Sequence, residues 1–94
     1  MYYTVEITRR AQRELTKLPM PDFQQISEVI KGLRDNPRPK GVRKIRGSIY
    51  RIRVGDWRII YSVFDKDKLV IIGKVVRRSE DTYNQVDKLF ENLS

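Results

Sequence analysis

Three arginines in the segment YRIRVGDWRIIY, residues 50–61, are the side chains best suited to chemistry. The segment alternates apolar and polar residues around a Gly-Asp pair that suits a two-residue turn, so it predicts a β-hairpin. In that register Arg53 lies directly opposite Arg58, and Arg51 projects from the same face because side chains alternate along a strand. Like charges opposite one another destabilise a sheet. One guanidinium group can donate two parallel hydrogen bonds to two oxygens of a phosphate. We therefore interpret this arginine face as a site for an anion.

The other face of the predicted hairpin is apolar. The same register pairs Val54 with Trp57 and Ile52 with Ile59 on this face. On the arginine face it pairs Arg51 with Ile60. The residues that share the apolar face are Tyr50, Ile52, Val54, Trp57, Ile59, Tyr61 and Val63. We interpret the three aromatic residues of this set as packing groups and not as platforms for RNA bases.

A further strand, LVIIGKVVR, follows the turn DKDK and adds a cation to the arginine face. With a loop of two or four residues, Arg58 lies opposite Val75 and Arg77 joins that face. A slip of one residue reverses the set of side chains and brings Lys74 and Arg78 there instead. The sequence leaves both registers open.

The elements that position these residues follow from the apolar spacing. Residues 2–7 alternate like a strand, and Thr8 then caps a first helix, which ends at Pro19. A second helix begins at Pro21 and ends at Asn36-Pro37. The remaining predicted elements are a basic loop or short edge strand over 38–48, the two hairpin strands, a strand over 69–77, and a last helix that begins at Ser79 and carries Tyr83.

The order strand, helix, helix, three strands, helix predicts an α+β fold, a two-layer sandwich with a mostly antiparallel sheet. The chain has 94 residues, no internal repeat and no Gly/Ser-rich linker, so we expect a single domain over 1–94. Two helices would cover the apolar face of the sheet. On the other face, the end away from the arginines carries apolar residues that the last helix or a partner chain would cover: Ile60, Phe64, Leu69 and Ile71.

The composition favours a polyanionic partner. Twenty Lys and Arg against twelve Asp and Glu give a formal charge of +8. No apolar run is long enough to span a membrane, no signal-peptide pattern is present, and no helix combines a lysine-rich face with apolar anchors, so we expect a cytoplasmic protein that binds nucleic acid and no membrane. The basic residues predicted to contact RNA phosphates are Arg43, Lys44, Arg46 and Lys74, although a solvated basic edge would have the same composition.

Cysteine and histidine are both absent from the chain. Their absence removes disulfides, thiolate metal sites and the usual general base. We therefore expect no metal and no cofactor, and an enzyme of this composition would depend on arginine electrostatics.

Four segments together resemble the RelE/ParE toxins of bacterial and archaeal type II toxin–antitoxin systems. They are A-x-x-x-L-x-K-L-P at 11–19, L-x-x-N-P at 33–37, the hairpin at 50–61, and R-R-S-E-D-T-Y at 77–83. The resemblance covers nearly the whole chain and implies the fold described above. For RelE-like members it implies ribosome-dependent cleavage of mRNA in the A site, silencing by a cognate antitoxin, and repression of operator DNA through that antitoxin.

Carried over by position, the resemblance implies an active face made of Arg51, Arg53, Arg58, Arg77 or Arg78, and Tyr83. The reaction would be attack of the RNA 2′-hydroxyl on the neighbouring phosphate, which leaves a cyclic phosphate and a 5′-hydroxyl. Arginine stays protonated, so Tyr83 is the candidate general base or a stacking platform, and Arg77 or Arg78 would steady or protonate the leaving oxygen. The chain departs from the family pattern, which often has lysine at positions 51 and 53.

Other interpretations of the same residues stay open. Tyr83 repeats at helical spacing with Val86 and Phe90, which is equally typical of a core residue. Glu80 and Asp81 would make the arginine face structural if they paired with it. The protein could also be a ParE-like gyrase inhibitor without catalysis, or a basic module that only binds nucleic-acid backbone. Replacing Tyr83 by Phe distinguishes these, because a backbone-binding module would scarcely respond.

Overall fold

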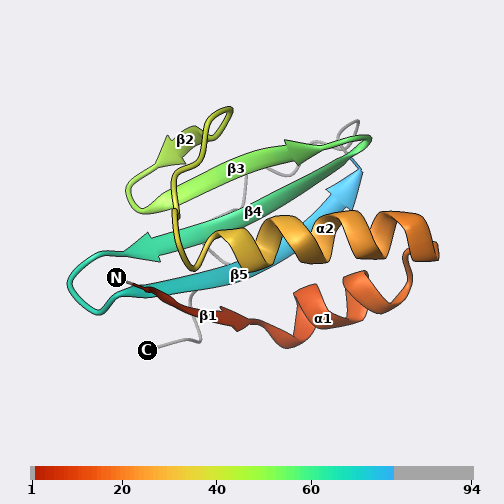
Figure 1. Cartoon of the computed structure of the whole chain (residues 1–94), viewed down its shortest axis with the longest axis horizontal. Coiled ribbons are helices and arrows are strands. Elements are labelled where there is room, and N and C mark those ends of the chain that lie inside the picture. Colours follow the sequence, from red (N-terminus) through yellow and green to blue (C-terminus); the bar gives the residue numbers. More distant parts are fainter. Residues whose placement is uncertain (1, 78–94) are drawn as a thin grey trace.

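A computed structural model describes residues 2–77 of the chain, and Figure 1 shows their arrangement. The elements are β1 (Thr4–Ile7), α1 (Arg9–Thr16), α2 (Met20–Gly32), β2 (Arg43–Arg46), β3 (Ile49–Val54), β4 (Trp57–Phe64) and β5 (Leu69–Arg77). The strands form one sheet in the order β1-β5-β4-β3-β2. Only the β1–β5 pair within this sheet is parallel. The predicted α+β fold is confirmed, and the predicted last helix lies outside the described residues.

Local sequence explains both helices. The Thr8 hydroxyl accepts a hydrogen bond from the backbone N–H of Ala11 at 3.2 Å, which satisfies one of the free donors at the start of α1. Helix α2 has proline in its first turn, where the missing N–H costs no hydrogen bond. It ends at Gly32, earlier than the predicted stop at Asn36-Pro37, because the N–H groups of residues 33–35 bond to carbonyls three residues back and tighten the chain into turns.

The hydrophobic core lies between these helices and one face of the sheet, across which α2 runs (Figure 1). The side chains that form it are Ala11, Leu15, Ile26, Ile30, Leu33, Ile52, Val54, Ile59, Tyr61, Val63, Val70, Ile72 and Val75. The helix-facing side of β3 and β4 is therefore the apolar face predicted for the hairpin. The arginine face is the opposite side of the same sheet.

Of the two edge strands, β1 is shorter than predicted, and β2 is the short edge strand that was one of the two alternatives for its segment. β1 covers only Thr4–Ile7, and Tyr2, which the alternation had placed in the strand, is 67% exposed. The basic stretch 38–48, predicted as a loop or a short edge strand, contains β2, which pairs antiparallel with β3. No helix within residues 2–77 is both long enough and apolar enough to cross a membrane.

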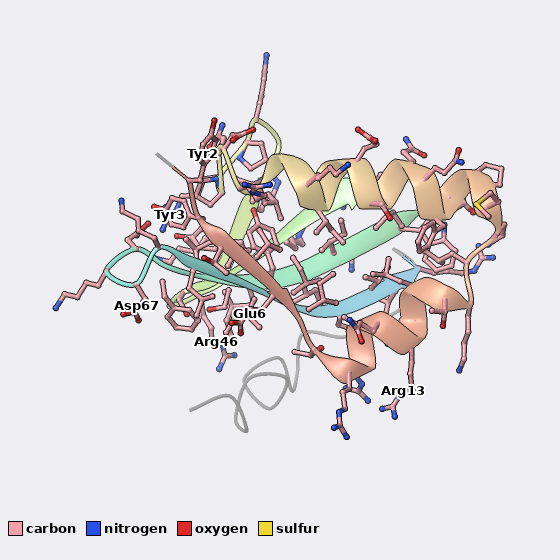
Figure 2. The ribbon with its side chains drawn as sticks, turned by 60° about the horizontal axis from the view of Figure 1, so that its bottom comes forward. Tyr2, Tyr3, Glu6, Arg13, Arg46 and Asp67 are labelled. Atoms are coloured by element: carbon pink, nitrogen blue, oxygen red, sulfur yellow. The ribbon has the colours of Figure 1, made fainter. Side chains whose placement is uncertain are left out.

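A polar network joins the loop before β2 to the β4–β5 turn. The Arg38 guanidinium donates to both carboxylate oxygens of Asp65, at 3.1 and 2.8 Å, and its Nε donates to the Tyr50 hydroxyl at 3.0 Å. The Tyr3 hydroxyl donates to the same carboxylate at 2.6 Å. Tyr3 and Asp67 mark this end of the molecule in Figure 2. These bonds tie β1, the 33–42 loop and the β4–β5 turn together.

This network makes stability depend on acid pH. Hydrogen bonds from Arg38, and then from Tyr3, lower the pKa of Asp65 from 3.8 to about 2. A depressed native pKa stabilises the fold above about pH 4, and that contribution is lost as the pH falls toward 2. We expect Asp65→Asn to lose less stability than the wild type between pH 4 and pH 2, measured as the urea midpoint.

Asp67→Asn is the matched control, because it removes a carboxylate from the same turn and leaves the Arg38–Asp65 pair in place. Equal acid sensitivity of Asp65→Asn and the wild type would contradict a native-state role for the pair.

Candidate active site

The hairpin of β3 and β4 has the predicted register. Gly55 adopts a φ of 60°, the left-handed conformation that a first-position glycine permits in a tight turn. Arg53 lies directly opposite Arg58, and Arg51 lies opposite Ile60. Arg53 is exposed and Arg51 is half-buried, whereas Arg58 is only 7% exposed. The sequence predicted the pairing of two guanidiniums but not the burial of one of them.

A row of cations crosses the sheet beside this pair. Arg43 on β2 pairs with Arg51, Arg51 pairs with Ile60, and Ile60 pairs with Lys74 on β5. Paired residues in antiparallel strands project from the same face, so all three cations belong to the arginine face. Neighbouring strands lie about 4.8 Å apart, so the row extends over roughly 14 Å. Such a row is long enough to follow a nucleic-acid backbone past more than one phosphate.

An irregularity in the β4–β5 pairing determines which basic residue of β5 projects from the arginine face. The loop has four residues and Phe64 does pair with Leu69, as the even-loop register requires. The register then shifts between Ile60 and Tyr61, so that Arg58 pairs with Val76. The predicted pairing of Arg58 with Val75 is therefore wrong. The extra residue on β5 reverses the side-chain set from that point onward.

This shift determines where the predicted third-strand residues lie. Arg77 pairs with Trp57, and its guanidinium lies 4.9 Å from the centre of the Trp57 ring, on the helix-facing side of the sheet. Of the two alternatives that the sequence left open, the structure therefore has the one that brings Lys74, and not Arg77, to the arginine face. Arg78, Tyr83, Glu80 and Asp81 lie outside the described residues, and their predicted roles stay predictions.

The basic residues of β2 divide between the two faces. Lys44 pairs with Tyr50 and belongs to the helix-facing side, while Arg46 pairs with Ile49 and belongs to the arginine face. In Figure 2 Arg46 and Glu6 both lie on the side of the sheet away from α2. Of the four residues predicted to contact RNA phosphates, three therefore share the face of the buried Arg58: Arg43, Arg46 and Lys74.

The aromatic residues of the hairpin are packing groups, as predicted. Tyr61 is fully buried, and its hydroxyl donates to the carbonyl oxygen of Pro37 at 2.7 Å. Burial raises the pKa of Tyr61 above its ordinary value. Tyr50 stacks on Tyr61 with ring centres 6.1 Å apart, and Trp57 packs against the same core. On the arginine face, the apolar side chains of Ile60 and Ile71 are also buried.

Two residues at the α1 end of the chain lie against the irregular part of β5: Thr8, which was predicted only as the helix N-cap, and Glu14, which the sequence did not single out. The Thr8 hydroxyl lies 3.3 Å from the carbonyl oxygen of Gly73, and the Glu14 carboxylate accepts the backbone N–H of Val75 at 2.9 Å. A lone glycine inside a strand pattern is a known sign of a bulge. Gly73 was therefore the signal that could have located this irregularity.

The arrangement suits phosphate binding. Within residues 2–77 there is no group of three His, Cys, Asp or Glu residues able to hold a metal ion. Arginine keeps its charge at any physiological pH, and its planar fork can hold two oxygens of one phosphate. A partly desolvated guanidinium beside a row of exposed cations can stabilise negative charge that develops on a phosphorus centre.

Three comparisons with known proteins match this chain to ParE or RelE proteins. A family model described as "ParE toxin of type II toxin-antitoxin system, parDE" matches residues 5–82. A protein of Methanocaldococcus jannaschii that carries the name toxin RelE1 is 36% identical over 83 residues, which is 83% of this chain and 92% of that protein. The RelE–RelB complex of Pyrococcus horikoshii matches with a TM-score of 0.79 and 34% identity, over 86% of this chain and all of the matched chain. The RelBE2 toxin–antitoxin complex of Mycobacterium tuberculosis matches with a TM-score of 0.73 and 29% identity, over 83% and 100%.

Proposed function

The chain belongs to the ParE toxin family of type II toxin–antitoxin systems, and from this premise we propose that it is a ribosome-dependent endoribonuclease that cleaves mRNA in the A site. The observation that supports this proposal best is the shared face of Arg43, Arg51, Lys74 and the opposed pair Arg53/Arg58. A toxin that acted only by protein–protein contact would not need two guanidiniums directly opposite one another in a sheet. One phosphate can accept hydrogen bonds from both guanidiniums.

In the proposed reaction the RNA supplies its own nucleophile. The 2′-hydroxyl attacks the adjacent phosphorus, the bond to the 5′-oxygen breaks, and a cyclic phosphate and a 5′-hydroxyl remain. Arg58 and Arg53 would hold the non-bridging oxygens and stabilise the charge that develops on them, which is usually the largest catalytic contribution. Arg51 and Lys74 would bind the neighbouring backbone. The ribosome would supply the in-line geometry.

The residues proposed for proton transfer come from the family resemblance, which places Tyr83 and Arg77 or Arg78 on the active face. The chain has no histidine, and arginine stays protonated, so Tyr83 is the candidate general base or a stacking platform for an RNA base. Arg78 remains the candidate for the leaving oxygen, since Arg77 lies over Trp57. Acid–base assistance contributes about 10²–10⁴ in rate. Electrostatics and ribosomal positioning would therefore still support slow cleavage if Tyr83 were a poor base.

The proposed partners follow from the family. RelE is seen together with RelB in the complex from Pyrococcus horikoshii, and we propose that a cognate antitoxin likewise holds this chain inactive. The pair would repress its own operon through the antitoxin's contact with operator DNA. The toxin would act in the cytoplasm, where its ribosomal substrate is.

The direct test is primer extension on mRNA, with and without ribosomes stalled with an empty A site. We expect a cut inside the A-site codon on programmed ribosomes and much slower cleavage of naked RNA. The same protein preparation is assayed for inhibition of gyrase supercoiling, because the matching family model is described as ParE. Gyrase inhibition without any cut on ribosomes would replace the ribonuclease proposal by the ParE-like alternative. Binding of RNA without either activity would leave only a nucleic-acid-binding module.

The salt dependence of RNA binding tests the row of cations. For single strands, each phosphate contact contributes about 0.7 to the slope of log Kobs against log salt. We expect Arg43→Ala to reduce the slope of binding to a single-stranded RNA oligonucleotide by about that amount. Lys31→Ala, an exposed position on α2 on the helix side of the sheet, is the matched control and should leave the slope nearly unchanged. Equal slopes for the two variants would remove Arg43 from the interface.

A further inference from the structure

Lys74 reaches the arginine face only because β5 contains one residue more than β4 at this point. Tyr61 pairs with Ile72 and Ile60 pairs with Lys74, so Gly73 is the residue left over. In a regular register without the bulge, Gly73 would pair with Ile60, and Lys74 would pair with Ile59 and project toward the core. A β-bulge of this kind re-aims the side chains beyond it.

Helix α1 holds both sides of the bulge. β1 pairs with β5 only as far as Ile72, and beyond that point α1 packs against β5. The backbone N–H of Thr8 bonds to the carbonyl of Ile72 at 3.0 Å, and its hydroxyl lies 3.3 Å from the carbonyl of Gly73. On the far side of the bulge the Glu14 carboxylate accepts the N–H of Val75 at 2.9 Å.

We infer that Glu14 is a positioning residue for the proposed phosphate site, because its bond to the Val75 N–H fixes the bulge that turns Lys74 toward the arginines. The inference rests on the proposed function and adds to it a residue on the opposite side of the sheet from the RNA. Val75 is 2% exposed, so its N–H has little access to water and depends on an acceptor from the protein. Loss of that acceptor would loosen the bulge and the direction of Lys74.

The variants separate a positional role from general destabilisation. Glu14→Ala and Glu14→Met both remove the acceptor. Methionine keeps the bulk of the side chain and, like glutamate, has a high helix propensity. Glu14→Gln keeps an oxygen that can accept the Val75 N–H. Lys74→Ala removes the cation itself. The double variant Glu14→Ala/Lys74→Ala shows whether the two residues act through one another.

Three measurements are made on each variant of the full chain. Amide hydrogen exchange reports the protection of the Val75 N–H, fluorescence anisotropy reports affinity for a 12-nucleotide single-stranded RNA, and primer extension reports cleavage on ribosomes. Glu28→Ala is the control for the change in net charge. Glu28 is exposed on α2, far from the bulge, and its replacement removes the same charge as Glu14→Ala.

We expect Lys74→Ala to weaken RNA binding and cleavage about tenfold, the size of one lost charge-assisted contact. Glu14→Ala and Glu14→Met should lose a comparable factor and speed exchange at Val75, while Glu14→Gln stays near wild type. The double variant should be no weaker than Lys74→Ala alone. Multiplied losses in the double variant, or unchanged exchange at Val75, would overturn the inference. If the wild type cleaves nothing, the proposed function fails, and the exchange and anisotropy measurements still decide the role of Glu14.

Discussion

Arg58→Ala is expected to lower ribosome-dependent cleavage by about 10²–10³, the loss that follows removal of one preorganised group that stabilises developing charge. Arg58 is 7% exposed and lies opposite Arg53, so its guanidinium is held in place and little reorganisation is needed when a phosphate binds. The rate is measured by single-turnover primer extension on programmed ribosomes. Arg58→Lys keeps the charge but loses the planar fork, and we expect it to recover only part of the rate.

The control for this substitution addresses both charge and folding. Arg10→Ala removes an exposed arginine from α1 and should leave cleavage unchanged. Because Arg58 is buried, circular dichroism and the urea midpoint of each variant are recorded beside the rate. A folded Arg58→Ala protein that cleaves at the wild-type rate would rule out the arginine face as the catalytic surface.

Tyr61→Ala is expected to destabilise the fold by about 3–5 kcal/mol, the cost of truncating a large buried aromatic side chain. Tyr61 is fully buried, stacks on Tyr50 and donates to the carbonyl of Pro37, so alanine leaves a cavity and an unsatisfied acceptor. Tyr61→Phe loses only the hydrogen bond and should cost about 1–2 kcal/mol. The free energy of unfolding is measured by urea denaturation.

Tyr2→Ala is the comparison for Tyr61→Ala, because Tyr2 is 67% exposed and its ring lies over Arg34 at the surface. We expect it to change the free energy of unfolding by less than about 0.5 kcal/mol. A similar loss of unfolding free energy in Tyr61→Ala and Tyr2→Ala would contradict the conclusion that Tyr61 stabilises the packing of the 33–42 loop on the sheet.

The hairpin shows how much of the candidate site could be predicted from the chain alone. Alternation of side chains and a Gly-Asp turn determine a two-stranded register locally, so the pairing of Arg53 with Arg58 needed no tertiary information. The same holds for the N-cap at Thr8 and for the four-residue turn before Leu69. The sequence left the faces of Lys74 and Arg77 open, and the single extra residue at Gly73 decides them.

Sequence by itself determined the α+β class, the apolar and arginine faces of the hairpin, and the dependence of any chemistry on groups other than histidine. These properties follow from composition and from periods of two and 3.6 residues, which act over a few neighbouring positions. Tertiary structure decided the burial of Arg58, the Arg38–Asp65 pair and the face that Lys74 joins. Each of these depends on contacts between residues far apart in the chain, such as Glu14 with Val75, and no local pattern encodes such a contact.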